Sequence, residues 1–310
     1  MIWLIGCKGM LGTELALLLE KTGLTFTGTG REVDITDPAA LRDFAEKQAA
    51  AGSVFQWIIN CAAYTAVDKA EDDAETCRRL NVEGPGNIAV LARNMGAKLI
   101  HISTDYVFDG KGTRPYREDD ATSPTGVYGL TKRDGELAVM ENSPGSYIIR
   151  TAWLYGKYGN NFVATMFRLM NERDSVLVVN DQRGSPTWAG DLAELITEII
   201  KADCRGRTIP YGIYHYSNKG DITWFDFASE IYSQGRRLGL IEKDCAVKPC
   251  VSTEYPSKVN RPAYSVLDKT KIAAALGVNI PAWDESLTTY LRLLTIKQGH
   301  ERNKSDLDVR

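Results

Sequence analysis

The first strand-to-helix turn constrains the fold of this chain more than any other feature. A short apolar run at residues 2–5 stops at Gly6, and Gly9 and Gly12 follow as a helical pattern begins. Glycines at such a turn let the backbone approach a pyrophosphate, whose charge is favoured by the free N–H groups at the start of a helix. A tight turn without any ligand is the simpler alternative. The spacing predicts a strand, a glycine turn and a helix, and it favours a dinucleotide site.

Strand and helix patterns alternate along most of the chain. Further strand-like runs are at 24–30, 55–60, 98–102, 147–153 and 176–180. This rhythm predicts an α/β fold with a Rossmann-like, doubly wound parallel sheet that binds its ligands at the carboxyl ends of the strands. From about Cys204 the strands are shorter, which indicates a smaller C-terminal substrate-binding domain. We therefore predict an NAD(P)-binding domain from 1–155 and 175–210, a substrate-binding domain from 156–174 and 211–296, and a polar tail at 297–310.

Composition narrows the partners and the compartment. The formal net charge of the 310 residues is -3 with acids and bases interspersed, which argues against nucleic acid or an anionic membrane as the main partner. The six cysteines form no C-x-x-C pair and suit reduced thiols better than disulfides or zinc. No apolar run reaches the roughly 18 residues of a membrane span, and the chain opens on a strand-like run rather than a signal peptide. We expect a cytoplasmic protein with a small-molecule substrate.

A tyrosine and a lysine four residues apart form the candidate catalytic pair. On a helix, Tyr128 and Lys132 lie on one face, one turn apart. An isolated tyrosine titrates near pH ~10, and a nearby ammonium lowers that pKa toward the range of general acid–base catalysis. Thr104, where the preceding strand ends, is placed to hydrogen-bond the same substrate oxygen. By itself the spacing is weak evidence, because a chain with 14 tyrosines also matches it by chance.

The end of the second strand bears on the choice of cofactor. An acidic residue there usually holds the ribose 2′-hydroxyl of NAD, whereas an arginine accommodates the 2′-phosphate of NADP. Here Arg31 follows Gly30, and no acid precedes it in the strand. We expect NADPH, with NADH as the alternative because Glu32 or Asp34 can take the acidic role.

With the glycine turn, Thr104 and the Tyr128/Lys132 pair in this order, the chain resembles the extended short-chain dehydrogenase/reductase family. More narrowly, it is similar to the dTDP-4-dehydrorhamnose reductases within that family. The matching stretches cover nearly the whole chain and are 60–71, 103–108, 127–132, 150–155, 159–162, 180–187 and 261–262 with Ser265. The resemblance implies reduction of the C4 carbonyl of dTDP-4-dehydrorhamnose to dTDP-L-rhamnose, with a hydride from the nicotinamide and a proton from Tyr128.

The resemblance also implies a role for each matching residue. Tyr128 is the proton donor, Lys132 binds the nicotinamide ribose and lowers the pKa of Tyr128, and Thr104 hydrogen-bonds the sugar carbonyl. Besides Tyr128, Lys132 and Arg31, the cofactor contacts are expected at Gly6, Gly9, Met10, Leu11, Gly12, Asp34, Ile35, Ala62, Ala63 and Thr65. The substrate contacts are expected at Thr104, Asp105, Tyr106, Trp153 and Arg261, with the loop at 180–187 toward the diphosphate.

One departure from the family concerns metal and assembly. Some members dimerise through a magnesium ion held by glutamates; Glu14 fits one such position, but Gly190 stands where another glutamate is expected. We therefore expect no metal, and we leave a homodimer open. Two other functions stay in view. One is a nucleotide-sugar epimerase or dehydratase of the same family, and the other is a non-catalytic NADP-binding regulatory subunit like the β subunit of methionine adenosyltransferase.

Overall fold

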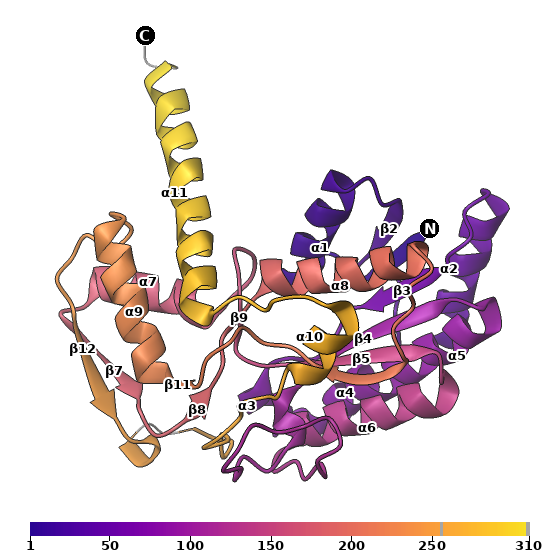
Figure 1. Cartoon of the computed structure of the whole chain (residues 1–310), viewed down its shortest axis with the longest axis horizontal. Helices are drawn as coiled ribbons and strands as arrows, with labels where there is room; N and C mark the ends of the chain where they lie inside the picture. The colour runs from indigo at the N-terminus through magenta and orange to yellow at the C-terminus, as the bar shows by residue number, and fades with distance from the viewer. Residues whose placement is uncertain (255–256, 308–310) are drawn as a thin grey trace.

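A parallel sheet of six strands forms the centre of the computed structural model, which describes residues 1–254 and 257–307 and the side chains through Thr295 (Figure 1). In spatial order the strands are β10 (Gly212–His215), β5 (Ser146–Thr151), β4 (Lys98–Thr104), β3 (Trp57–Asn60), β1 (Ile2–Ile5) and β2 (Phe26–Thr29). Every neighbouring pair is parallel, which confirms the predicted α/β fold. The strand order reverses between β1 and β3, so ligands are expected at the carboxyl ends of these two strands.

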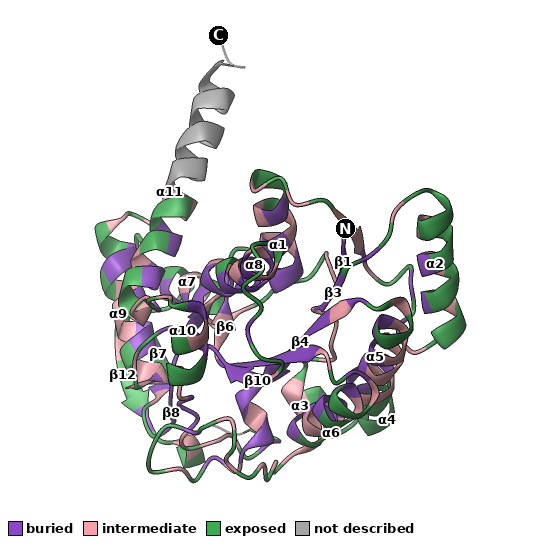
Figure 2. Cartoon of the chain, turned by 45° about the vertical axis from the view of Figure 1, so that its right-hand side comes forward, coloured by how far each residue is buried: buried purple, intermediate pink, exposed green. Residues whose placement is uncertain are grey.

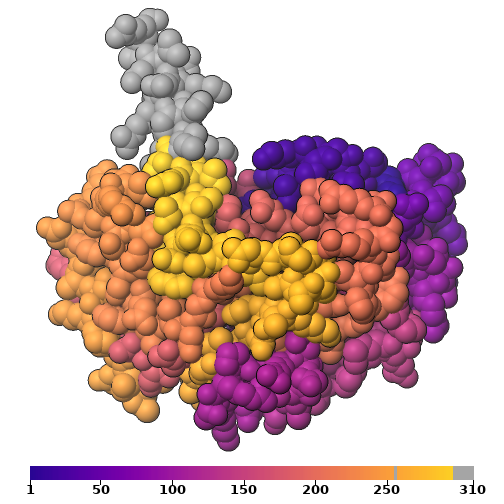
Figure 3. Space-filling view, in the orientation of Figure 1, coloured from indigo at the N-terminus to yellow at the C-terminus, as the bar shows by residue number. Residues whose placement is uncertain are grey.

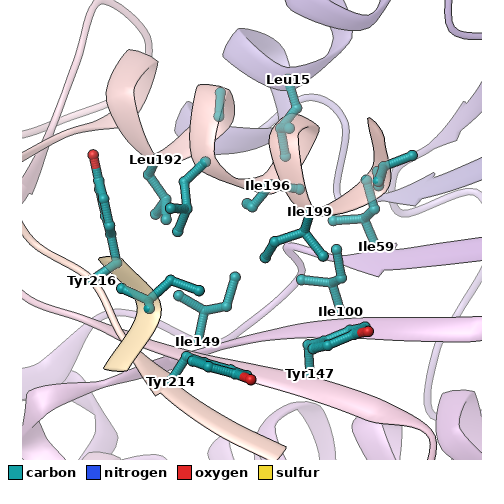
Figure 4. Packing of buried hydrophobic residues seen from close by; sticks show 14 of the residues in the cluster. Leu15, Ile59, Ile100, Tyr147, Ile149, Leu192, Ile196, Ile199, Tyr214 and Tyr216 are labelled. Carbon is teal, nitrogen blue, oxygen red and sulfur yellow. The ribbon is translucent and has the colours of Figure 1, made fainter. Parts of the chain in front are cut away.

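Helices cover both faces of this sheet. Successive residues of a strand point to opposite faces, and both sets are apolar here, so each face needs a covering layer. From β1, Ile2 and Leu4 enter the apolar cluster that includes residues of α1 (Met10–Lys21) and α8 (Ala189–Cys204), whose packing is shown in Figure 4. Trp3 and Ile5 enter the opposite cluster, with residues of α2 (Pro38–Ala50) and α5 (Gly84–Met95). The central strands are accordingly buried, while the outer sides of the helices are exposed (Figure 2).

A second, smaller body has its own apolar cluster outside the six-stranded sheet. The cluster is formed by α7 (Phe162–Glu172), β7 (Ser175–Val179), α9 (Trp224–Arg237), β12 (Ala246–Cys250) and the first turns of α11 (Trp283–Leu307). α10 (Thr270–Leu276) packs instead on the main sheet. Figure 3 shows the yellow C-terminal residues lying across the junction between the orange surface of the smaller body and the coral surface of α8.

Two strands belong to sheets other than those expected. The run at 176–180 was predicted as a strand of the main sheet, but β7 pairs with β12 in a separate sheet. Conversely, β10 lies in the stretch assigned to the substrate-binding domain, yet it is the sixth strand of the main sheet. Only the alternate residues Val176 and Val178 of β7 are buried, which suits a strand covered on one face rather than on both. The exact domain boundaries stay a prediction.

Short elements complete the chain. They are α3 (Val67–Ala70), α4 (Ala74–Arg78), the π-helical turn η1 (Arg79–Glu83), η2 (Asp105–Val107), β6 (Leu154–Tyr155), β8 (Arg183–Gly184), β9 (Thr187–Trp188), β11 (Ile222–Thr223) and η3 (Ser252–Glu254). The backbone of α11 continues to Leu307, but the side chains of the predicted polar tail at 297–310 lie outside the described residues. Within the described chain, no helix combines the length and the apolar character that crossing a membrane requires.

The helix that carries Tyr128, α6 (Val127–Asn142), is fastened to its neighbours by close packing and by a buried ion pair. Glu136 and Arg150 of β5 are 2.7 Å apart, and each side chain is 3% exposed. Toward η1, a Cβ on Gly135 would lie only 2.0 Å from the Asn81 carbonyl oxygen. Only a glycine allows this approach, so the position of α6 is set by backbone contact.

Two glycine-to-alanine changes test this packing. Gly135→Ala places a methyl group against the Asn81 carbonyl and should lower the free energy of unfolding by about 2 kcal/mol or more. In the facing helix α5, a Cβ on Gly86 would lie 3.5 Å from the Ala138 Cβ, an ordinary contact. Gly86→Ala should therefore be neutral or stabilise by about 0.5–1 kcal/mol through helix propensity. Urea unfolding of both variants measures the difference, and equal losses would contradict the close approach.

Candidate active site

The glycine turn after β1 brings two backbones into contact at the strand-order reversal. Gly6 has a left-handed backbone with φ +79°, and a Cβ there would lie 2.7 Å from the Ala62 amide nitrogen. A Cβ on Gly12 would lie 2.1 Å from the Gly6 carbonyl oxygen. α1 has no side-chain cap at Gly9, so the first amides of the helix, including those of Met10 and Leu11, are available to an anion.

A buried asparagine fixes the loop after β3. Asn81 accepts a hydrogen bond from the Tyr64 amide at 2.8 Å and donates one to the Tyr64 carbonyl oxygen at 3.1 Å. The same loop carries Ala62, Ala63 and Thr65, three predicted cofactor contacts. Sequence analysis missed this function of Asn81. The sequence held no signal for it, because the charged residues Arg78, Arg79 and Glu83 surround Asn81.

A carboxylate, Glu32, and two cationic side chains, Lys8 and Arg31, lie together at the end of β2. The Glu32 carboxylate accepts a hydrogen bond from the Gly30 amide at 2.6 Å, and the Lys8 ammonium lies 3.3 Å from it. The Gly30 amide is the main reason that the pKa of Glu32 is lowered, so this carboxylate is ionised at neutral pH. Arg31 is exposed beside it. The acid absent from the strand itself is thus present three residues after its last residue, Thr29.

The two predicted contacts on the adenine side differ in exposure. Asp34 is exposed and accepts hydrogen bonds from the amide and hydroxyl of Thr36, which lower its pKa. Ile35 is buried against α5, where a Cβ on Gly84 would lie 2.6 Å from the Ile35 Cδ1 atom. The Ile35 side chain therefore belongs to the core, and only its backbone is left for a ligand.

Lys132 is a buried cation between α6 and β4. Its ammonium donates a hydrogen bond to the Ile102 carbonyl oxygen at 2.6 Å, and the residue is 2% exposed. Burial lowers the pKa of Lys132 to about 8, while Glu136 one turn further along α6 opposes the fall. At neutral pH the side chain is therefore mostly protonated.

Tyr128 lies with Thr104 and Tyr106 at the carboxyl end of β4. Its ring meets the Tyr106 ring edge-on, with 5.5 Å between the centroids. Burial raises the pKa of Tyr128 above its ordinary value, although a hydrogen bond with the Thr104 hydroxyl opposes the rise. The predicted net lowering of this pKa is therefore wrong, because the effect of burial is larger than any opposing one. The phenol is protonated at neutral pH, which is the form that donates a proton.

The residues that flank Thr104 have separate environments. The Ser103 hydroxyl donates to Glu136 at 2.5 Å, so of the two neighbouring hydroxyls only that of Thr104 reaches Tyr128. Asp105 is buried, and burial raises its pKa to about 6. Burial also raises the pKa of Tyr106 to about 12. Asp105 is therefore mostly protonated only below pH 6 and mostly ionised at neutral pH.

Trp153 joins the two bodies of the molecule. Its backbone is left-handed, with φ 47°, a conformation that large side chains rarely adopt and that is typical of functional sites. Its ring stacks on Trp224 of α9 at 3.6 Å between centroids and 11° between planes. A Cβ on Gly184 would lie 2.5 Å from the same ring. One ring face is therefore already covered, and only the rest of the indole is left for the predicted sugar contact.

A pocket of about 760 Å³ lies in the smaller body. Phe162 and Trp224 give it an apolar wall, and Gln182 and Arg261 contribute polar groups. Its volume is in the usual range for small-molecule sites. Arg261 also lies near enough to Tyr106 to oppose the rise of its pKa, and the Tyr106 ring contacts that of Tyr128, so the pocket adjoins the catalytic tyrosine.

The loop at 180–187 contributes less to this pocket than expected. Asp181 and Gln182 line it. Other members of the loop stabilise the fold, through the contacts Arg183–Asp221, Ser185–Gly220 and Thr187–Ala152. Only the first residues of the loop are therefore placed to face a diphosphate, and not the whole loop as predicted.

The two positions considered for magnesium do not fit a metal site. A Cβ on Gly190 would lie 2.5 Å from the Trp188 ring, so that ring occupies the space a glutamate would need. Glu14 is partly buried, which raises its pKa, and Lys157 faces it. Among the described residues there is no group of three or more His, Cys, Asp or Glu side chains able to hold a metal ion.

The glycine turn and the Tyr128/Lys132 pair, with the lysine buried, lie at one edge of a parallel sheet and define an NAD(P)-dependent oxidoreductase of the short-chain dehydrogenase/reductase class. Comparison with known proteins gives the family. The protein-family model described as "RmlD substrate binding domain" matches residues 1–296, and the chain belongs to this family.

The relatives in the comparison span almost the same length as this chain. A dTDP-4-dehydrorhamnose reductase of Streptomyces griseus is 47% identical over 301 residues, which are 96% of this chain and 95% of the relative. The crystal structure of a dTDP-4-dehydrorhamnose reductase from Clostridium acetobutylicum has a TM-score of 0.86 and 39% identity, covering 94% and 99% of the two chains. The enzyme of that name from Bacillus anthracis, in complex with NADP, has a TM-score of 0.85 and 36% identity, covering 94% and 98%.

The buried Lys132 predicts a pH dependence of stability. Its pKa is about 8 in the folded protein against an ordinary 10.5, so between these values the unfolded state binds more protons and stability rises with pH. From pH 7 to pH 10, the free energy of unfolding of the wild type should therefore rise by about 2 kcal/mol relative to Lys132→Met. Urea unfolding of the cofactor-free proteins at both pH values measures this change. A difference that stays constant with pH would contradict it.

Proposed function

We propose that this protein reduces the C4 carbonyl of dTDP-4-dehydrorhamnose to dTDP-L-rhamnose, with NADPH or NADH as the hydride donor. The observation that carries the proposal is the neutral, half-buried Tyr128 beside Thr104, at the same sheet edge as the glycine turn. The name of a relative 47% identical to this chain agrees with it.

The cofactor supplies the hydride, and this chain supplies its binding site. In the turn from Gly6 to Gly12 the backbone packs too closely for side chains at Gly6 and Gly12, and the first amides of α1, including those of Met10 and Leu11, have no side-chain cap and take the pyrophosphate. Ala62, Ala63 and Thr65 take the ribose and nicotinamide side, where Asn81 holds the loop in place. Lys132 binds the nicotinamide ribose. A solved relative contains NADP, which supports this assignment.

Tyr128 donates the proton that completes the reduction. As the hydride reaches C4, negative charge develops on the carbonyl oxygen, and the Tyr128 hydroxyl transfers its proton to that oxygen. An alkoxide is much more basic than a phenolate, so the raised pKa of Tyr128 does not prevent the transfer. Thr104 donates a hydrogen bond to the same oxygen. The nearby Lys132 ammonium stabilises the resulting phenolate until solvent returns the proton.

The substrate spans the two bodies of the molecule. Asp105, Tyr106 and the free part of Trp153 contact the sugar, and Arg261 faces the diphosphate. The pocket of about 760 Å³ takes the nucleoside, whose base packs on the apolar wall. An epimerase or dehydratase and a regulatory subunit are less favoured, because the relative named above is a reductase. A cytoplasmic location and a homodimer stay predictions.

Replacing the proton donor tests the mechanism. Tyr128→Phe should lower kcat by roughly a hundredfold or more, because it removes the acid but little ground-state binding. The Kd for NADPH should change by less than about twofold. The assay follows oxidation of NADPH and NADH with the sugar made in place from dTDP-glucose by the dehydratase and epimerase that precede this step.

A matched control is Tyr211→Phe, because Tyr211 is 43% exposed and its ring lies against Tyr147, at the amino end of β5. It should leave kcat unchanged. Near-normal turnover by Tyr128→Phe would refute the role of the phenol. No sugar-dependent oxidation by the folded wild type with either cofactor would refute the reductase itself.

The charges at the end of β2 predict how the two cofactors are distinguished. Arg31→Met removes a cation near the 2′-phosphate and should lower the Kd ratio of NADH to NADPH by about three- to tenfold. Glu32→Gln removes the carboxylate held by Gly30 and Lys8, and it should raise the same ratio by a similar factor. Fluorescence titration with both nucleotides measures the ratios. If both variants shift the ratio in the same direction, this assignment of charges is wrong.

A further inference from the structure

We infer that Asp68 is a positioning residue for substrate binding, and that it acts through Arg261. The segment concerned, residues 257–263, is called the strap below. It forms part of the wall of the pocket in the smaller body. This inference rests on the proposed function, because it assigns the strap to the nucleotide-diphosphate part of the substrate.

One end of the strap is held by the backbone. The Ala263 carbonyl oxygen accepts a hydrogen bond from the Arg183 amide at 2.8 Å, and the Tyr264 amide donates to the Gly110 carbonyl oxygen at 2.9 Å. Pro262 lies against Gly110 so closely that a Cβ on Gly110 would be 2.5 Å from the Pro262 Cα. This end is therefore a fixed part of the fold.

The remainder of the strap is held by side chains from the segment around α3. Arg261 donates to one Asp68 carboxylate oxygen at 2.8 Å, and Ser257 donates to the other at 3.1 Å. Lys258 pairs with Asp72. Asp68 and Ser257 are 189 residues apart in the sequence, yet α3 and the strap lie beside each other (Figure 1). Asp68 is the residue that engages two positions of the strap at once.

The same segment also touches the start of the catalytic helix. Glu71, three residues after Asp68, accepts a hydrogen bond from the Val127 amide at 2.8 Å. Val259 of the strap is buried beside Gly126, where a Cβ would lie 3.3 Å from a Val259 methyl carbon. The strap thus spans the space between the pocket and the helix that carries Tyr128. Its position therefore affects whether a single ligand can occupy the pocket and contact Tyr128.

Asp68 has two opposing effects on an anionic ligand. Its carboxylate repels a diphosphate, but it also fixes Arg261 in the orientation that faces the pocket. The Asp68 and Arg261 side chains are 44% and 36% exposed, so solvent screens the repulsion. Releasing the strap would require the ligand to order several residues when it binds, and each ordered residue costs conformational entropy. The positioning effect is therefore expected to dominate.

The first experiment measures binding of dTDP by calorimetry. Asp68→Asn should weaken dTDP binding by about three- to tenfold, while the Kd for NADPH and the thermal unfolding midpoint stay unchanged. Glu75→Gln is the matched control, because this exposed carboxylate on α4 pairs with Arg78 and not with the strap. It should leave dTDP binding unchanged. Equal or tighter binding of dTDP by Asp68→Asn overturns the inference.

A second experiment tests whether Asp68 acts through Arg261. In an Arg261→Gln background, adding Asp68→Asn should weaken dTDP binding by less than about twofold, because the partner is already lost. The same three- to tenfold loss in both backgrounds would mean that Asp68 acts independently and would overturn the inference. Failure of the proposed function is seen separately, as the absence of sugar-dependent oxidation of NADPH or NADH by the wild type.

Discussion

The contact between the backbones of Gly6 and Ala62 sets the geometry at the reversal of strand order. Side chains are excluded there, since a Cβ on Gly6 would lie 2.7 Å from the Ala62 nitrogen. The carboxyl ends of β1 and β3 therefore present amides and small residues to a ligand. The loop after β3 is in turn held by Asn81, and α6 approaches Asn81 through Gly135. The position of Tyr128 thus depends on a series of close backbone contacts.

Burial controls the chemistry of the site more than attraction between charges does. It keeps Tyr128 neutral and lowers the pKa of Lys132 to about 8. The ion pair of Glu136 with Arg150 is buried as well, and Ser103 adds a further hydrogen bond to it. Such a pair costs desolvation free energy, but breaking it leaves a buried charge, so it favours one position of α6. Because the Tyr128 hydroxyl already carries its proton, it is ready to act once the substrate carbonyl lies against it.

The sequence was informative where one physical cause produces one pattern. A strand covered on both faces is apolar throughout, and the turn after β1 admits only glycine at Gly6 and Gly12. The pattern of an apolar run does not identify its partner strand, so β7 was placed in the wrong sheet. The pKa of Tyr128 and the stacking of Trp153 on Trp224 depend on groups distant in the sequence. The contact of Asp68 with Arg261, 193 residues apart, had no local signal at all.

The late origin of β10 has a consequence for synthesis on the ribosome. Before residues 212–215 have left the exit tunnel, the main sheet has an uncovered edge along β5, whose residues are all buried in the finished molecule. By then the chain has already produced α7, β7 and α8, and β7 itself still awaits β12. Both sheets therefore have an open edge at the same time, and unpaired edges promote aggregation. A pause in translation between β5 and β10 would therefore prolong the stage at which the nascent chain can aggregate through these edges.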